Sequence, residues 1–148
     1  MLKTEIQELA IDLMSQWGLP EKGWSFQFFK STVSVGRCRY TDKKILFSTV
    51  FLETPEEEVR DVLLHEIAHA LAGYDAAHGP VWKEWAVRVG CRPEVKTKKA
   101  VRAELKWIIY CTGCELKCQR TRKIRDGMYL CNKCKSPIKC KANPNYGF

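Results

Sequence analysis

All three histidines of this 148-residue chain lie within residues 61–82. His65 and His69 are four residues apart in an apolar run with helical spacing, so both imidazoles project from one helix face, one turn apart. Two such imidazoles can bind a metal ion, and Glu66 can reach a water at that metal without binding the ion itself. The HExxH pattern therefore predicts a catalytic Zn²⁺ with Glu66 as the general base.

A catalytic zinc site needs a third protein ligand and one open position for water. His78, nine residues after His69, is the remaining imidazole of the sequence and is the expected third ligand. The alternative is a pair of histidines buried in the core without a metal. The metal interpretation is favoured because HExxH falls in a well-formed helical pattern and leaves no histidine for another role.

Four of the eight cysteines form two CxxC pairs with sixteen residues between them. Cys111 with Cys114, and Cys131 with Cys134, have the spacing of a four-cysteine zinc ribbon, which predicts a second, structural Zn²⁺. A disulfide or redox role for the CxxC pairs is the alternative. The zinc interpretation is preferred because the sequence shows no export signal.

The segment between the two CxxC pairs is expected to fold as a hairpin that turns at residues 126–127. So small a module has almost no core, and metal binding must supply much of its folding free energy. Cys118 or Cys140 could replace one of the predicted ligands. Cys38 and Cys91 are expected to act as small apolar side chains.

The net charge of +8 is unevenly distributed along the chain. Residues 1–90 hold 10 Lys+Arg against 13 Asp+Glu, whereas residues 91–148 hold 15 against 4. A basic tail on a near-neutral body is typical of a protein that contacts phosphate backbones through its tail; a solvated basic surface is the alternative. The candidate DNA-contacting residues are Arg120, Arg122, Lys123, Arg125, Tyr129 and Lys133.

The elements that position these residues follow from periodicity. Apolar residues at helical spacing predict a first helix from a capping box at Thr4 to Trp17. Residues 24–49 then alternate with a period of two, which predicts a small antiparallel sheet of three strands. Gly36 in this sheet could mark a bulge or a close backbone approach. An exposed edge strand could hold an extended peptide over the metal.

The HExxH helix is expected to begin with Thr54 as N-cap and Pro55 as its first residue, and to end at Gly73. Another helix is expected from about Val81 to Val89. A basic connector with few apolar residues follows, with a short helix expected near residues 101–106. The fold class is therefore α+β, with a small β zinc ribbon at the end.

The N-terminal segment alternates acidic and apolar residues, so it is neither a signal peptide nor a membrane span. The expected protein is intracellular, in the cytoplasm and associated with DNA, and neither secreted nor bound to a membrane.

The combination of HEIAH, HGPVW and a YCTGC to CNKC ribbon resembles SprT-like proteins, the group that includes the Spartan DNA-dependent proteases. The likeness runs from roughly residue 24 to residue 134, and Gly79 and Trp82 match the HGxxW continuation of that family. The resemblance implies a zincin-like metalloprotease domain at 1–92, a basic connector at 93–106 and the ribbon at 107–148. It also implies DNA-bound or DNA-crosslinked proteins as substrates. The spacing between His69 and His78 is shorter than in Spartan itself, so the chain looks like a compact bacterial or viral relative of that protease.

The expected reaction is peptide hydrolysis, with zinc lowering the pKa of its water and Glu66 accepting the proton. Because every histidine is a predicted ligand, the oxyanion must be stabilised by another donor. Two alternatives remain: a non-catalytic zinc-dependent nucleic-acid-binding or regulatory protein, and a peptidase whose ribbon docks onto protein. The candidate oxyanion donors are Tyr40, Tyr74, Arg37 and Arg39, and the candidate partners of the histidine rings are Asp61 and Asp75.

Overall fold

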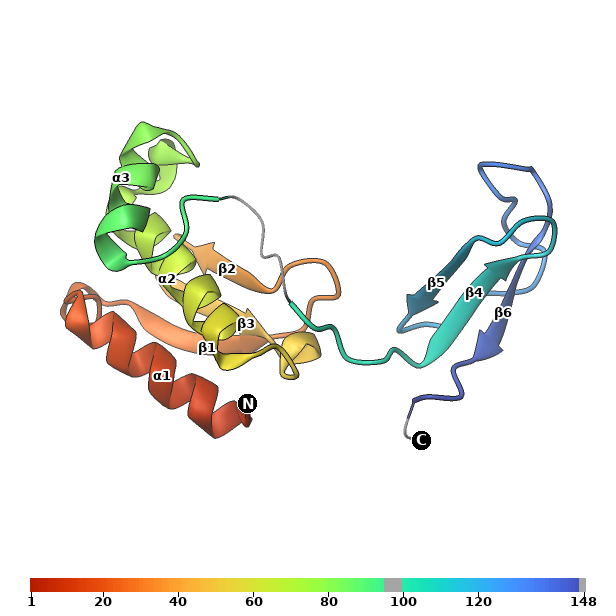
Figure 1. The fold of residues 1–148 in the computed structure, drawn as a ribbon, viewed down its shortest axis with the longest axis horizontal. Coiled ribbons are helices and arrows are strands. Elements are labelled where there is room, and N and C mark those ends of the chain that lie inside the picture. The colour runs from red at the N-terminus through yellow and green to blue at the C-terminus, as the bar shows by residue number, and fades with distance from the viewer. Residues whose placement is uncertain (95–99, 147–148) are drawn as a thin grey trace. The chain divides into compact units, whose positions relative to one another are not determined.

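The computed structural model describes residues 1–94 and 100–146. The chain forms two compact units, Met1–Ala103 and Glu104–Phe148. The first unit contains helices and a small sheet, and the second contains a separate three-stranded sheet (Figure 1). The expected α+β class is confirmed.

The first unit is built from three α-helices, three short 3-10 helices and one sheet. A helix precedes the sheet, and the HExxH helix and a further helix follow it. The bounds are α1 (Lys3–Gln16), η1 (Pro20–Lys22), β1 (Ser25–Phe29), β2 (Gly36–Arg39), β3 (Lys44–Ser48), η2 (Thr49–Phe51), α2 (Glu56–Ala72), η3 (Tyr74–Ala76) and α3 (Pro80–Val89).

The sheet of the first unit is mixed, so the prediction of an antiparallel sheet was wrong. Its order is β1-β3-β2: β3 pairs antiparallel with β2 and parallel with β1. Because β3 lies between the other two strands, Ile45, Leu46 and Phe47 are all buried although successive side chains point to opposite faces. Strand β2 is left as an edge beside α2.

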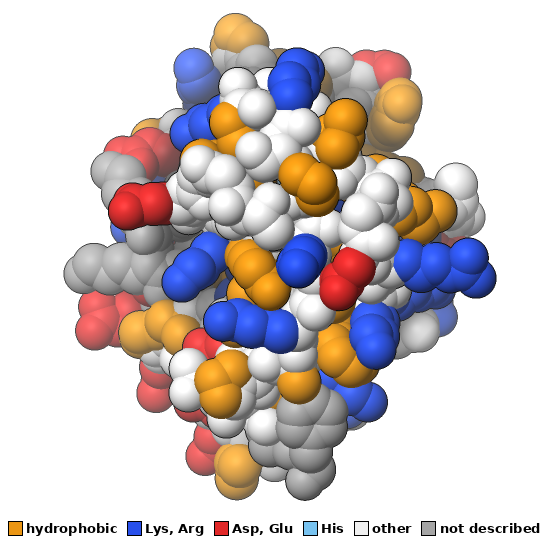
Figure 2. All heavy atoms as spheres, turned by 90° about the vertical axis from the view of Figure 1, so that its right-hand side faces the viewer, with side chains coloured by type: hydrophobic (Ala, Val, Ile, Leu, Met, Phe, Trp, Pro, Cys, Tyr) orange, Lys and Arg blue, Asp and Glu red, His pale blue; other side chains and the backbone are white. Residues whose placement is uncertain are grey.

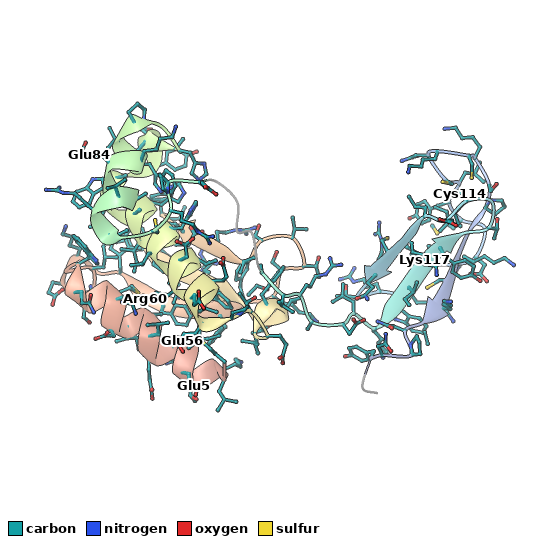
Figure 3. All side chains as sticks on the ribbon, viewed as in Figure 1. Glu5, Glu56, Arg60, Glu84, Cys114 and Lys117 are labelled. Carbon is teal, nitrogen blue, oxygen red and sulfur yellow. The ribbon has the colours of Figure 1, made fainter. Side chains whose placement is uncertain are left out.

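The core of this unit lies between α1, α2 and the sheet (Figure 1). Helix α2 buries Val59, Leu63 and Ile67, which recur every four residues along one face. Glu5 on α1, Arg60 on α2 and Glu84 on α3 are exposed (Figure 3). In the described part of the chain, no helix is long and apolar enough to cross a membrane.

Both predicted N-caps were wrong by one or two residues, whereas Gly73 is the C-cap of α2 as predicted. Helix α1 begins at Lys3, and the carboxylate of Glu5 accepts a hydrogen bond from the amide of Leu2 at 2.7 Å. Helix α2 has Pro55 as its N-cap, because the hydroxyl of Thr54 is already bonded elsewhere. Thr54 Oγ1 accepts a hydrogen bond from the amide of Val101 at 2.9 Å. It donates one to the carbonyl of Val101 at 3.4 Å.

The chain beyond α3 is extended where it is described, so the predicted short helix at 101–106 is absent from residues 100–106. Besides the bonds between Thr54 and Val101, the amide of Ala103 donates to the carbonyl of Val50 at 2.6 Å. This part of the predicted connector is therefore anchored on the first unit. Residues 95–99 of that connector lie outside the described residues.

The second unit contains β4 (Trp107–Cys111), β5 (Lys117–Arg120) and β6 (Ile138–Ala142). Strand β4 is central and pairs antiparallel with both neighbours. The predicted hairpin was wrong, because the first CxxC pair itself turns the chain from β4 into β5. A turn does occur at Asp126 and Gly127, where Gly127 has φ +75°, but no strands pair across it among the described residues.

Candidate metal centres

Helix α2 and the loop after it bring the three imidazoles together. His65 and His69 lie one turn apart on α2, and Gly73, with φ +93°, ends the helix as its amide donates to the carbonyl of His69 at 2.9 Å. The chain then returns through η3 so that Nε2 of His78 lies 3.2 Å from Nε2 of His65 and 3.0 Å from Nε2 of His69. The three ring nitrogens converge on one point.

This donor set fits a divalent cation such as Zn²⁺. The ligand atoms of the three histidines all lie within 4.8 Å of one another. Burial lowers the pKa of His65 to about 4, with the neighbouring His78 as the next cause, and burial likewise lowers the pKa of His69 to about 4. These two imidazoles are therefore neutral at pH 7, which is the form that binds a metal.

Trp82 packs behind all three imidazoles. Its side chain is fully buried, and its ring centroid lies 4.6 Å from that of His65, 5.3 Å from that of His69 and 4.8 Å from that of His78. Its Nε1 donates to the main-chain carbonyl of His65 at 3.4 Å. One side chain from α3 therefore limits the rotation of every ring in the cluster.

Glu66 lies beside the imidazoles with only 8% of its surface exposed. Burial raises the pKa of its carboxyl to about 8, although a hydrogen bond from the amide of Cys38 and the charge of Arg37 both favour the ionised form. A raised carboxyl pKa close to neutrality suits a group that accepts and returns a proton. The side chain therefore has the surroundings of a general base.

Gly36 of β2 allows α2 to approach the sheet at Glu66. A Cβ at this position would lie 2.7 Å from Cγ1 of Val62 and 3.1 Å from Cγ of Glu66. A real side chain would displace α2 or the carboxylate. Of the two roles expected for Gly36, the structure confirms the close backbone approach.

A cavity of about 710 Å³ opens over the histidine cluster. Residues of β2 form one wall, α2 forms the floor, and the loop with η3 forms the other wall. The space is large enough for a segment of extended peptide. The lining residues are Ser34, Gly36, Arg37, Cys38, Tyr40, His65, Glu66, His69, Tyr74, Asp75, Ala77 and His78.

The structure separates the candidate oxyanion donors. Arg37, Tyr40 and Tyr74 line the cavity, and the hydroxyl of Tyr40 donates to the main-chain carbonyl of His69 at 3.3 Å. Arg39 is absent from the lining, and its Nε instead pairs with Asp42 at 2.6 Å. Tyr74 is largely exposed, so its hydroxyl faces solvent at the cavity rim.

The two candidate aspartate partners also differ. Asp75 lines the cavity, whereas the carboxylate of Asp61 accepts hydrogen bonds from Arg92. One guanidinium nitrogen of Arg92 also contacts Glu58 at 2.5 Å, so a single arginine joins two carboxylates of α2. Sequence reasoning missed this ion-pair cluster, because the partners are about thirty residues apart and only the fold brings them together.

The second cluster contains the four cysteines of the CxxC pairs. The Sγ atoms of Cys111 and Cys134 lie 3.3 Å apart, those of Cys114 and Cys131 lie 3.7 Å apart, and all four lie within 4.8 Å of one another. Hydrogen bonds from Ser136 lower the pKa of the Cys134 thiol to about 6. A thiolate in a four-sulfur cluster of this size fits a tetrahedral Zn²⁺.

The remaining cysteines do not belong to this cluster of four. Cys118 and Cys140 occupy the strands on either side of Ile109, and Cys140 packs against the small core of the second unit. Cys91 is buried, as expected for a small apolar side chain. Cys38 instead lines the cavity, where burial raises the pKa of its thiol to about 12 and a hydrogen bond joins it to Tyr40.

All six candidate DNA-contacting residues are exposed. They lie at the end of β5 and in the segments that follow it, and Lys123 Nζ lies 5.3 Å from the ring centroid of Trp107. Figure 2 shows lysine and arginine side chains interspersed with hydrophobic ones on one face of the molecule. The residues are Arg120, Arg122, Lys123, Arg125, Tyr129 and Lys133.

Comparison with known proteins places these sites in a family context. A sequence model of the SprT-like family matches residues 7–102, which contain the three histidines, Glu66 and Trp82. The "Germ cell nuclear acidic protein" of Drosophila melanogaster is 29% identical over 120 residues, covering 71% of this chain and 12% of the relative. The "Germ cell nuclear acidic-1 protein" of Caenorhabditis elegans is 29% identical over 116 residues, covering 68% of this chain and 22% of the relative.

A bacterial relative is similar over a shorter stretch. The "Protein SprT-like" of Geobacillus kaustophilus is 33% identical over 92 residues, covering 57% of this chain and 60% of the relative. The aligned part is therefore less than two thirds of the length of each of these three relatives. Because the family match spans well over half of the residues, and includes the imidazole cluster, this chain belongs to the SprT-like family.

Proposed function

We propose that this chain is a zinc-dependent endopeptidase with a zincin-like domain at its N-terminal end. The observation that carries the proposal is the convergence of three imidazole Nε2 atoms beside the buried carboxyl of Glu66, on the floor of an open cavity. Three protein ligands leave a fourth zinc position for water, as in catalytic rather than structural sites. Membership of the SprT-like family supports the same assignment.

His65, His69 and His78 would hold the catalytic zinc, which when bound polarises a carbonyl and acidifies a water. Glu66 would accept the proton from the attacking water and deliver it to the leaving amine. Its raised pKa makes both transfers feasible near neutral pH. The hydroxyl of Tyr40 and the guanidinium of Arg37 remain candidate donors to the oxyanion.

The peptide would lie along the free edge of β2. The amide of Ser48 donates to the carbonyl of Val35, and in an antiparallel pair the hydrogen-bonded positions alternate. The main-chain groups of Gly36 and Cys38 are therefore directed away from β3, toward the cavity side. An extended substrate can pair with the groups of this edge that α2 does not use.

The second unit would be a zinc ribbon that associates with DNA. Residues 104–148 carry 10 Lys+Arg against 3 Asp+Glu, and the six candidate contact residues are exposed. The names of two relatives describe nuclear proteins, which is consistent with work near DNA. The proposed substrates are proteins bound or crosslinked to DNA, brought to the cavity when the ribbon binds nearby nucleic acid.

The test compares wild type with Glu66→Gln and with Glu57→Gln, an exposed carboxylate on the same helix. The substrate is a basic protein bound to DNA, incubated with and without that DNA. We expect Glu66→Gln to keep both zinc ions and lose cleavage, and Glu57→Gln to cleave like wild type. Equal cleavage by Glu66→Gln would remove the mechanism.

Two outcomes would favour other functions. Zinc and DNA binding by wild type without any proteolysis would indicate a non-catalytic zinc-dependent regulatory protein. DNA affinity that hardly changes between 50 and 200 mM salt would indicate that the ribbon docks onto protein instead, because phosphate contacts make binding strongly salt-dependent.

A further inference from the structure

The loop that carries His78 contains a backbone conformation that is rare for residues with a side chain. Ala77, the residue before His78, has φ 44° and ψ −127°. The amide of Gly79 donates to the carbonyl of Ala76 at 2.9 Å, which closes a four-residue turn with Ala77 and His78 at its centre. The angles of Ala77 match the first central position of a type II′ turn, where glycine is preferred.

The methyl group of Ala77 makes this turn less stable. A Cβ at a positive φ lies close to the backbone, so a non-glycine residue in such a conformation is strained. Ala77 is exposed, and its methyl group therefore gains little from burial. The closed turn is less favourable with alanine than it would be with glycine, and other contacts must hold it.

The contacts of the His78 ring hold the turn closed. The ring packs on Trp82, with 4.8 Å between the centroids. Each ring Nε2 carries either one N–H group or one lone pair. Nε2 of His78 lies 3.2 Å from that of His65 and 3.0 Å from that of His69, so without a cation it can make a good hydrogen bond to only one of them. A divalent cation binds all three nitrogens through their lone pairs.

The same loop, residues 74–78, forms one wall of the cavity over the histidines. Tyr74, Asp75, Ala77 and His78 all line that cavity. The amide of Ala77 donates to the carbonyl of Tyr74 at 3.4 Å, which is long for a backbone hydrogen bond. Release of His78 would therefore also open this wall.

We propose that strain at Ala77 makes the position of His78, and with it this wall of the cavity, dependent on zinc. With the ion bound, the three imidazoles hold the turn closed against the strain. Without the ion, Ala77 returns to an ordinary backbone conformation and His78 moves away from His65 and His69. Ala77 is thus a positioning residue for the third ligand. The inference rests on the catalytic zinc site proposed above and adds how that site controls the peptide cavity.

Hydrogen exchange followed by mass spectrometry tests this on the full reduced chain, titrated with buffered free zinc. The segment 74–79 reports the turn, and peptides from residues 111–134 report the cysteine cluster separately. In wild type, segment 74–79 should exchange about tenfold faster without zinc than with it, because the hydrogen bond of the turn opens. The free zinc concentration at half protection of segment 74–79 measures the affinity of the histidine cluster.

Ala77→Gly relieves the strain, so half protection should need about fivefold less free zinc than in wild type. The matched control is Ala76→Gly, the same chemical change one residue earlier, where φ is not positive. This control only adds flexibility to the open loop and should need about twofold more free zinc. A gain in zinc affinity cannot come from a variant that fails to fold, so the Ala77→Gly result decides.

Equal protection of segment 74–79 with and without zinc would overturn the proposal, because the packing of α2 and α3 would then hold the turn by itself. Zinc binding by Ala77→Gly that is no tighter than by Ala76→Gly would overturn it as well. Elemental analysis separates these results from a failure of the metal site. One zinc ion per wild-type chain, bound by the cysteines alone, would refute the histidine site proposed above and this inference with it.

Discussion

The indole of Trp82 donates a hydrogen bond to the main-chain carbonyl of His65, with 3.4 Å between the two atoms. The same indole contacts the rings of all three histidines. A carbonyl in the middle of a helix normally accepts only from the amide one turn later, so this bond ties α3 directly to α2 at the histidine cluster. Ring packing and one hydrogen bond thus hold the loop carrying His78 against the HExxH helix.

Trp82→Ala should lower the free energy of unfolding by about 3–5 kcal/mol, because it leaves a cavity behind the imidazoles. Its zinc affinity should fall by about tenfold or more, since the rings lose their support. Trp82→Phe keeps most of the packing and should cost about 1–2 kcal/mol. Urea unfolding and competition with a zinc chelator measure both quantities. Unchanged zinc affinity in Trp82→Ala would show that the rings are held by other contacts.

Gly36→Ala should impair activity more than metal binding. The new Cβ would meet Val62 Cγ1 at 2.7 Å and Glu66 Cγ at 3.1 Å, so the carboxylate must move, whereas no histidine atom is among the three nearest contacts of that Cβ. Overpacking of this kind costs about 1–3 kcal/mol of stability. Zinc content, urea unfolding and cleavage rate are the measurements.

The control for this prediction is the double variant Gly36→Ala with Val62→Ala. The second substitution removes the methyl group that the new Cβ meets first. The double variant should recover part of the cleavage rate lost in Gly36→Ala. If it recovers nothing while zinc content is normal, the close approach to Val62 is not what limits Glu66.

Both metal clusters could be predicted from sequence, because each depends on local spacing. Three residues separate His65 from His69 on one helix face, and two residues separate the cysteines of each CxxC pair. The order of strands could not be predicted in this way. The period-two pattern predicted an antiparallel sheet, but β3 lies between β1 and β2 and pairs parallel with β1.

The surroundings of Glu66 also could not be predicted without the fold. Nothing in the local sequence of Cys38 indicates that its amide is directed at Glu66, 28 residues later, because that contact depends on α2 packing beside an edge strand. The role of Thr54 was missed for a similar reason. Threonine is a common N-cap residue, and the position of Thr54 before α2 suits that role. Its hydroxyl instead bonds to the main chain of Val101, so a distant partner replaces the first amides of the helix.

Glu66 should make the metal-free protein less stable as pH rises. The pKa of its carboxyl is 4.5 in the reference state and about 8 in the fold, so between these values the folded state holds an extra proton. The contribution of Glu66 to the free energy of unfolding is therefore complete below pH 4.5. It decreases as the pH rises above 4.5 and is lost once the pH passes 8. Glu66→Gln cannot titrate and should gain stability relative to wild type from pH 5 to pH 8.

Urea unfolding at pH 5, 6.5 and 8 measures this difference, followed by tryptophan fluorescence, since four of the five tryptophans lie in Met1–Ala103. His65 and His69 titrate with the opposite sign, from about pH 4 to 6.5, but they are common to both proteins and cancel in the comparison. Parallel stability profiles for the two proteins would contradict the prediction.

Cys131→Ser should lower the zinc content from two ions per chain to one. Cys131 is fully buried within the cluster of four cysteines, and serine is a poor zinc ligand. Cys118→Ser is the matched control, because Cys118 is an exposed cysteine of the same unit outside that cluster. Elemental analysis of the purified variants gives the count. Loss of zinc from Cys118→Ser would mean that the ligand set differs from the four cysteines of the two CxxC pairs.

Arg92→Ala should lower the free energy of unfolding by about 1–3 kcal/mol. The variant leaves the carboxylates of Glu58 and Asp61 on adjacent turns of α2 without their shared cation, and Glu58 is only 8% exposed. The guanidinium itself is 37% exposed, so water offsets part of the loss and the effect should shrink at 1 M salt.

Arg92→Lys is the matched control for charge. The lysine ammonium keeps the positive charge but cannot reproduce the forked contacts of Arg92 with both Asp61 and Glu58. The free energy of unfolding of Arg92→Lys should therefore lie between those of Arg92→Ala and wild type. Because Asp61 lies one turn before His65 on α2, loss of the ion-pair cluster should also loosen the first turn of the metal-binding face. Hydrogen exchange of the amides near Asp61 should therefore accelerate in Arg92→Ala. Exchange at the wild-type rate would show that the core contacts of α2 alone fix this turn.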